Sequence, residues 1–301
     1  MSEPKPVDAG SYLALASGVV ALGISPLLVR SVAASSLVIA TYRTALTVPI
    51  GFAAMRMGGG HLSSGLLRRA AVGGLLIGTA SIVGFWSLQE TSVVNFMVIT
   101  AMQPLIVGVL AVRLLGERPT GRQVALSTTA LAAVVVLVLA GKATSSHPFG
   151  DFLALISVLL ISGYMISMKH ARNDGVHAEA YMAGVYVASA AIVLPIALLG
   201  GADLAAPRGD DWLWLVLLAI TSGAGGHGLI ARAQRSVTIT VTAVASLASA
   251  VVATTGAWLV LDERLTIPQV VAAAVALAAL GAVLVDQASR VDRSAGSASG
   301  S

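Results

Sequence analysis

Ten long stretches that hold almost no charged residue run through this chain, and they constrain its fold more than any other feature. Each is 17 to 26 residues long, and together they hold 211 of the 301 residues. A helix needs about 20 apolar residues to cross the hydrocarbon of a bilayer. The pattern therefore predicts ten membrane-spanning helices. They are residues 12–29, 31–55 (interrupted only by Arg43), 70–89, 91–112, 123–141, 152–168, 180–202, 212–231, 236–261 and 265–285.

The amino-acid composition excludes a water-soluble enzyme. The chain is 56% hydrophobic and 11% charged, whereas a soluble domain is about 25% charged. It has no cysteine, which excludes disulfides and thiolate metal ligands. A membrane barrel would show shorter strands of alternating polarity. We therefore expect an all-α integral membrane protein. Its first span is kept, because only Lys5 precedes it and a signal peptide carries a clearer basic region.

Basic residues predict the orientation of the spans. With the N-terminus in the cytoplasm, 13 of the 18 lysines and arginines face the cytoplasm and four face outward, while Arg43 lies inside a span. Such an excess marks the cytoplasmic side. Ten spans then also leave the C-terminus in the cytoplasm. The four tryptophans all fall near outer ends, which fits an interfacial aromatic belt, with ligand stacking as the alternative. They are Trp86, Trp212, Trp214 and Trp258.

The two halves of the chain repeat each other at an offset of 146 residues. LLGERPTGRQ (114–123) matches VLDERLTIPQ (260–269), and Pro49 matches Pro195. Each half holds five spans, and an odd number inverts the second copy. Inverted repeats around a midplane site are typical of transporters. The sequence therefore predicts two inverted five-helix repeats. The expected units are a tail (1–11), the first repeat (12–141), an external linker (142–151), the second repeat (152–287) and a flexible tail (288–301).

Three segments carry a resemblance to a known family. They are SLQETSVVNFMVITAMQPLIVGVLAVRLLGERPTGRQ (87–123), RAQRSVTITVTAVASLASAVVATTGAWLVLDERLTIPQ (232–269) and YRTAL (42–46). Their order resembles the EamA domain of the drug/metabolite transporter superfamily. The resemblance implies a carrier that exports small metabolites, namely amino acids, related compounds or toxic analogues, from a bacterial cell. It implies alternating access across the inner membrane, with a small-molecule substrate and membrane lipids as partners.

Two ionisable residues inside the spans are candidates for substrate binding, because such groups are costly in a bilayer. Arg43 can attract an anionic group such as a substrate carboxylate. Alternatively, it extends to the interface or pairs with Glu90. His227 lies in TSGAGGHGLIAR (221–232) and can carry a proton, contact substrate or make a packing hydrogen bond. No span interior contains Asp or Glu, so facilitated efflux and proton antiport both fit.

Polar and aromatic residues of other spans complete the expected pocket. Asn95 and Gln103 lie about 80° apart on a helix, and their amides can line a cavity or bond a neighbouring helix. Pro104 frees a backbone carbonyl and can form a hinge. Tyr164 and Trp86 are expected to add an amphipathic wall.

Glycines at matching places in the third and eighth spans suggest where a cavity opens or a hinge moves. The alternative is close helix packing. The candidates are Gly78, Gly223 and Gly226.

No pattern in the sequence supports catalysis or ATP-driven pumping. There is no P-loop, HExxH or G-x-S-x-G. We expect no enzyme activity, no metal or other cofactor, no ATP and no nucleic-acid partner, and we expect a monomer. Two other classes remain as alternatives. A membrane sensor or interaction protein should carry an extra soluble domain, and a lipid-modifying enzyme needs a cluster of Asp, His or Ser at one interface.

Overall fold

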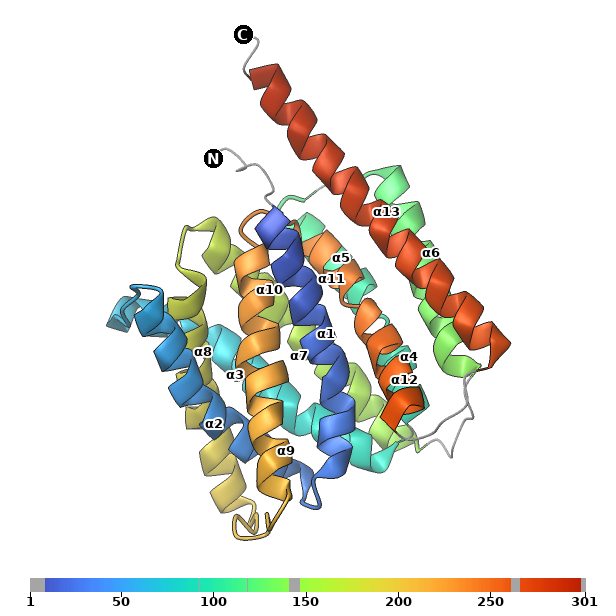
Figure 1. Ribbon diagram of the computed structural model, residues 1–301. Helices are drawn as coiled ribbons and strands as arrows, with labels where there is room; N and C mark the ends of the chain where they lie inside the picture. Colours follow the sequence, from blue (N-terminus) through green and yellow to red (C-terminus); the bar gives the residue numbers. More distant parts are fainter. Residues whose placement is uncertain (1–8, 92, 118, 141–146, 261–265, 299–301) are drawn as a thin grey trace.

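The computed structural model describes residues 9–91, 93–117, 119–140, 147–260 and 266–298, and these residues contain helices and no strand (Figure 1). Ten helical segments among them are long and apolar enough to cross a membrane. The expectation of an all-α protein with ten transmembrane helices is thus confirmed. The elements are α1 (Ala9–Ser31), α2 (Ser36–Met57), α3 (Ser64–Glu90), α4 (Val93–Thr100), α5 (Gln103–Leu114), α6 (Gly121–Leu139), α7 (Pro148–Asn173), α8 (Ala178–Leu199), α9 (Asp211–Leu218), the π-helix η1 (Ala219–Gly226), α10 (His227–Ala233), α11 (Ile239–Ala245), α12 (Ala248–Val260) and α13 (Ile267–Ala298).

Several helices extend beyond the uncharged stretches. α3 begins at Ser64 and includes Arg68 and Arg69, because a helix continues into the membrane interface where charges are solvated. α7 begins at Pro148, within the segment expected as a linker. α13 continues to Ala298, into the segment expected as a flexible tail.

The repeated T-x-x-Q pattern is a helix start signal. Thr120 and Gln123 form a capping box at the start of α6, in which the Thr120 hydroxyl accepts from the Gln123 amide and the Gln123 side chain accepts from the Thr120 amide. Thr266 and Gln269 form the same reciprocal pair before α13. A capping box satisfies backbone donors that the first helical turn leaves free. The sequence repeat therefore encodes two equivalent helix starts.

The two five-helix halves interlock. α1 packs against α9, η1, α10 and α12 of the second half, and α7 packs against the corresponding α3, α4 and α5 of the first half. In the same way α3 packs against α8, and η1 packs against α2. The equivalent helices α6 and α13 lie side by side and run in opposite directions, so the second repeat is inverted (Figure 1). α1 begins and α13 ends on the same side of the bundle, which we call the termini side (Figure 1).

Two spans are broken at positions that differ by one residue between the repeats. The fourth span is interrupted at Ala101–Met102, between α4 and α5, and the ninth at Ser246–Leu247, between α11 and α12. Pro104 stands in the first turn of α5, but the equivalent residue after the second break is Ala250. At each break a side-chain hydroxyl donates to a backbone carbonyl of its own helix. Thr100 donates to the Met97 carbonyl (3.1 Å), and Ser246 donates to the Thr242 carbonyl (3.0 Å). Such back-bonding bends helices.

Candidate functional site

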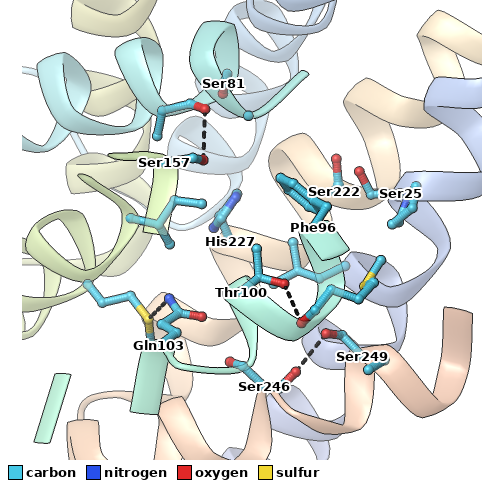
Figure 2. Close-up of a pocket in the computed structure, with 18 of the residues that line it drawn as sticks. Ser25, Ser81, Phe96, Thr100, Gln103, Ser157, Ser222, His227, Ser246 and Ser249 are labelled. Carbon is cyan, nitrogen blue, oxygen red and sulfur yellow. Dashed lines mark hydrogen bonds between the residues drawn. The ribbon is translucent and has the colours of Figure 1, made fainter. Parts of the chain in front are cut away.

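A cavity of about 220 Å³ lies between the two halves. Helices of both repeats line it. The lining residues of α1 and α3 fall between Leu22 and Val29 and between Ile77 and Leu88, in the half of each helix away from the termini side. Figure 2 shows the serine and threonine side chains of this lining together with His227.

Arg43 contributes a buried cation to the cavity. Its side chain comes from α2, and the residue is 8% exposed. Nη1 donates to Ser81 Oγ (3.0 Å), Nε to Ser222 Oγ (3.3 Å) and Nη2 to the Ser222 carbonyl (3.4 Å). Its guanidinium carbon lies 5.9 Å from the centre of the Phe85 ring, within range of a cation–π contact. Arg43 therefore points into the protein and does not extend to the interface.

Glu90, the alternative partner of Arg43, bonds elsewhere. Its carboxylate accepts from Trp86 Nε1 at 3.1 Å. Three ion pairs occur among the described residues, and none involves Arg43. The pairs are Arg69–Asp174, Arg122–Asp286 and Arg232–Glu179.

An eight-residue π-helix positions the groups around Arg43. η1 occupies Ala219–Gly226 in the middle of the eighth span. Three carbonyls of this segment accept from side chains of other helices: that of Ala219 from Thr47 Oγ1 (3.5 Å), that of Ser222 from Arg43 and that of Gly223 from Tyr186 Oη (3.1 Å). π-Helical turns are rare and recur at functional sites. His227, the first residue of α10, follows directly.

His227 and Tyr164 lie together in the cavity lining. Their rings meet edge to face, with 5.3 Å between centroids. The Tyr164 hydroxyl lies 3.5 Å from the sulfur of Met168 and 3.5 Å from that of Met182, which are weak acceptors. Gln103 also lines the cavity, and its Nε2 lies 3.0 Å from Met165 Sδ. The structure thus brings Arg43, Gln103, Tyr164 and His227 together, with Pro104 beside them.

The structure does not add the two other predicted binding residues to this group. Trp86 is 41% exposed near the end of α3, where it stacks edge to face on Phe149. It is not among the cavity-lining residues, and its position fits an interfacial belt. The backbone of Asn95 belongs to α4, but its side chain lies outside the described residues.

The three predicted cavity or hinge glycines lie at close helix crossings. A Cβ at Gly78 would lie 2.8 Å from Ser189 Oγ of α8, and one at Gly226 would lie 2.8 Å from Leu22 Cδ2 of α1. A Cβ at Gly223 would overlap Thr47 Oγ1 of α2. None of the three lines the cavity. Their observed surroundings match close packing, which keeps α3 and η1 against helices of the other half.

The sequence analysis missed the serines that surround Arg43 and His227. Ser81, Ser157, Ser222 and Ser246 all line the cavity (Figure 2). The repeat indicated some of them, because at the 146-residue offset Ser81 is equivalent to His227, and Thr100 is equivalent to Ser246. Serines in apolar spans are otherwise common packing residues, so their type alone identified none of them.

A polar network on the termini side holds the connection between α10 and α11. Lys169 of α7 is 7% exposed, and its Nζ donates to the carbonyls of Gln234 (2.6 Å) and Val237 (2.8 Å), in the connection between α10 and α11. The Glu117 carboxylate accepts from the amides of Ile239 (2.9 Å) and Thr240 (3.3 Å) at the start of α11. A cation at the end of one helix and an anion at the start of the next match the two helix dipoles. The connection between α10 and α11 is therefore held by hydrogen bonds from Lys169 of α7 and from Glu117, which follows α5.

Comparisons with known proteins agree with this architecture. The EamA-like transporter family matches the chain twice, over residues 9–139 and 148–285. No curated protein sequence matches it. One solved crystal structure is similar with a TM-score of 0.78 at 20% sequence identity, over 93% of this chain and 98% of its own, which shows a shared fold. The two family matches fall one in each half and cover nearly all of the chain, so this protein belongs to the EamA-like transporter family.

Proposed function

We propose that this protein is a secondary transporter that exports small metabolites, amino acids or related compounds, across the bacterial inner membrane by alternating access. The observation that carries the proposal is the cavity between two inverted halves with the buried Arg43 in its wall. Buried charges in membrane proteins mark substrate pathways. The network of Lys169 and Glu117 supplies a seal that must open for a substrate to pass.

The proposed orientation places the termini side in the cytoplasm. Most basic residues then face the cytoplasm, as the charge rule requires. On α1 and α3 the cavity lining lies in the halves away from that side, and on α7 and α10 it reaches Met168 and Ile230, next to the Lys169 network. We therefore assign the structure to a conformation closed toward the cytoplasm. Trp86, Trp212 and Trp258 are 41–47% exposed and would sit in the outer interface among membrane lipids.

We favour facilitative export over proton antiport. The interiors of the spans contain no carboxylate, so a relay of acidic residues through the membrane is absent from the sequence. His227 is the histidine among the described residues that line the cavity, and an imidazole is the side chain that most often carries protons in proteins. It is therefore the carrier to test if protons drive transport.

The proposal is tested by reconstituting the full chain into liposomes and measuring counterflow with a panel of labelled amino acids. At least one compound should exchange, and Arg43→Gln should slow that exchange at least tenfold. Arg69→Gln is the matched control, because Arg69 is 58% exposed and pairs with Asp174 outside the cavity. Absence of exchange for the whole panel, or equal loss in both variants, would contradict the proposal.

A further inference from the structure

The charge that the described lining residues bring to the cavity is positive only. Arg43 supplies a permanent cation, and no Asp or Glu is among the residues that line the cavity in the described part of the chain. The described ion pairs also leave Arg43 without a carboxylate. A buried charge without a counter-ion is costly, because the low dielectric does not replace the lost hydration. An anionic ligand would supply the missing charge.

The hydrogen bonds of Arg43 leave it ready to exchange partners. Its three acceptors are two serine hydroxyls and one carbonyl, all neutral, at 3.0–3.4 Å. A guanidinium has five N–H donors in a planar fork, and a carboxylate can accept two of them in parallel. Such charge-assisted bonds are shorter and about twice as strong as neutral ones. A carboxylate ligand would therefore compete successfully with the serines.

The rest of the wall is apolar. Phe85, Phe96, Met97, Ile161 and Met165 line the cavity beside the polar groups around Arg43. A cavity of about 150 Å³ accommodates benzene, so the roughly 220 Å³ here leaves room for an apolar group of that size and a short polar head. A ligand with one charged end and one apolar end matches this division.

The same wall offers little to an ammonium group. The described lining holds hydroxyls, thioethers, one amide and one imidazole, none of which carries a negative charge. An ammonium ion in this cavity would be desolvated and repelled by Arg43. An amino group on the ligand therefore gains no partner that repays its burial.

We propose that the recognised substrate is a monocarboxylate with an apolar body, bound through Arg43, and that its amino group contributes nothing to binding. This inference rests on the proposed function and narrows its substrate class. It places the carboxylate on Arg43 in the group formed with Ser81 and Ser222, and the apolar body against the phenylalanines and methionines. Deaminated analogues should then bind at least as well as the amino acids themselves.

The test is calorimetric binding of four matched compounds to the purified full chain: 3-phenylpropanoate, phenylalanine, phenylalaninamide and phenethylamine. We expect 3-phenylpropanoate to bind at least as tightly as phenylalanine, and at least tenfold more tightly than the amide and the amine. Arg43→Gln should weaken 3-phenylpropanoate at least tenfold, whereas Arg69→Gln should leave it unchanged. The ranking in the unmodified protein decides the matter even if the Arg43 variant fails to fold.

Equal affinity for acid and amide, tighter binding of the amine, or no binding of any acid would overturn the inference. Flux in liposomes is measured in parallel. Acid-selective binding without flux would contradict the proposed transport and leave the inference standing. Flux of phenylalanine that 3-phenylpropanoate does not inhibit would overturn the inference and leave transport standing.

Discussion

Replacing Gln234 by methionine should lock the termini side shut. Gln234 is 0% exposed, and neither its side-chain oxygen nor its nitrogen has a hydrogen-bond partner among the described residues. A buried polar group left unbonded costs about 1–3 kcal/mol. Opening of this side exposes the amide to water and relieves the cost. Methionine has a similar length and no group that requires a hydrogen-bond partner. Gln234→Met should therefore shift the equilibrium between the open and the sealed state by about 5- to 150-fold toward the sealed state.

The assay uses the absence of native cysteine. A single cysteine at Ala233, which is 0% exposed and outside the cavity lining, is labelled from the termini side with an impermeant maleimide. Gln234→Met should slow labelling by the factor above. Gln287→Met is the matched control, because Gln287 is 3% exposed but accepts from Thr238 and donates to Ser236, and its loss should speed labelling. Faster labelling in Gln234→Met, or equal effects of the two changes, would refute the reasoning.

Three further predictions concern packing, topology and coupling. Gly226→Leu should abolish transport while the protein still inserts, because even a Cβ there would lie 2.8 Å from Leu22. Gly228→Leu should be tolerated, since a Cβ at that position has no atom within 4 Å. Substrate flux and the yield of protein in the membrane fraction test both variants. A reporter fused after Arg118 should be cytoplasmic and one after Arg264 external, both positions lying outside the described residues, and finding both on one side would exclude the proposed topology. If transport is facilitative, His227→Gln should still exchange substrate, with a changed affinity at most. If protons drive transport, the same change should abolish substrate accumulation in liposomes under a pH step. Accumulation that survives in His227→Gln would place the coupling group elsewhere.

The spans were predictable from the sequence because the bilayer excludes charge. Uncharged stretches marked all ten crossings, and the repeated T-x-x-Q marked the starts of α6 and α13. Helix ends were less predictable, since α7 and α13 continue beyond the hydrocarbon where charges are tolerated. The π-helix Ala219–Gly226 was not predicted at all. Its geometry depends on side chains from other helices, Arg43 and Tyr186, which bond the Ser222 and Gly223 carbonyls.

The candidate site was predictable where one residue is costly by itself. Arg43 and His227 are ionisable groups inside apolar spans, so their type alone marked them. Trp86 was selected for its aromatic ring, but a ring near the end of a span is equally suited to the interface. The structure places Trp86, 41% exposed, near the end of α3. Ser81 and Ser222 could not be selected singly, since only the fold brings them to Arg43.

Equivalent positions of the two halves can be compared to separate residues that serve packing from residues that serve substrate recognition. Their packing is similar, since Thr47 of α2 meets Gly223 of η1, and Val193 of α8, the residue equivalent to Thr47, meets Gly78 of α3. Their chemistry differs, because the residue 146 positions after Arg43 is Ser189, which is buried against α3. Packing constrains both copies alike, so a difference in charge at equivalent positions is not explained by packing. In an inverted-repeat carrier, substrate recognition is therefore best sought where the two halves agree in shape and differ in charge, and in this chain that criterion selects Arg43.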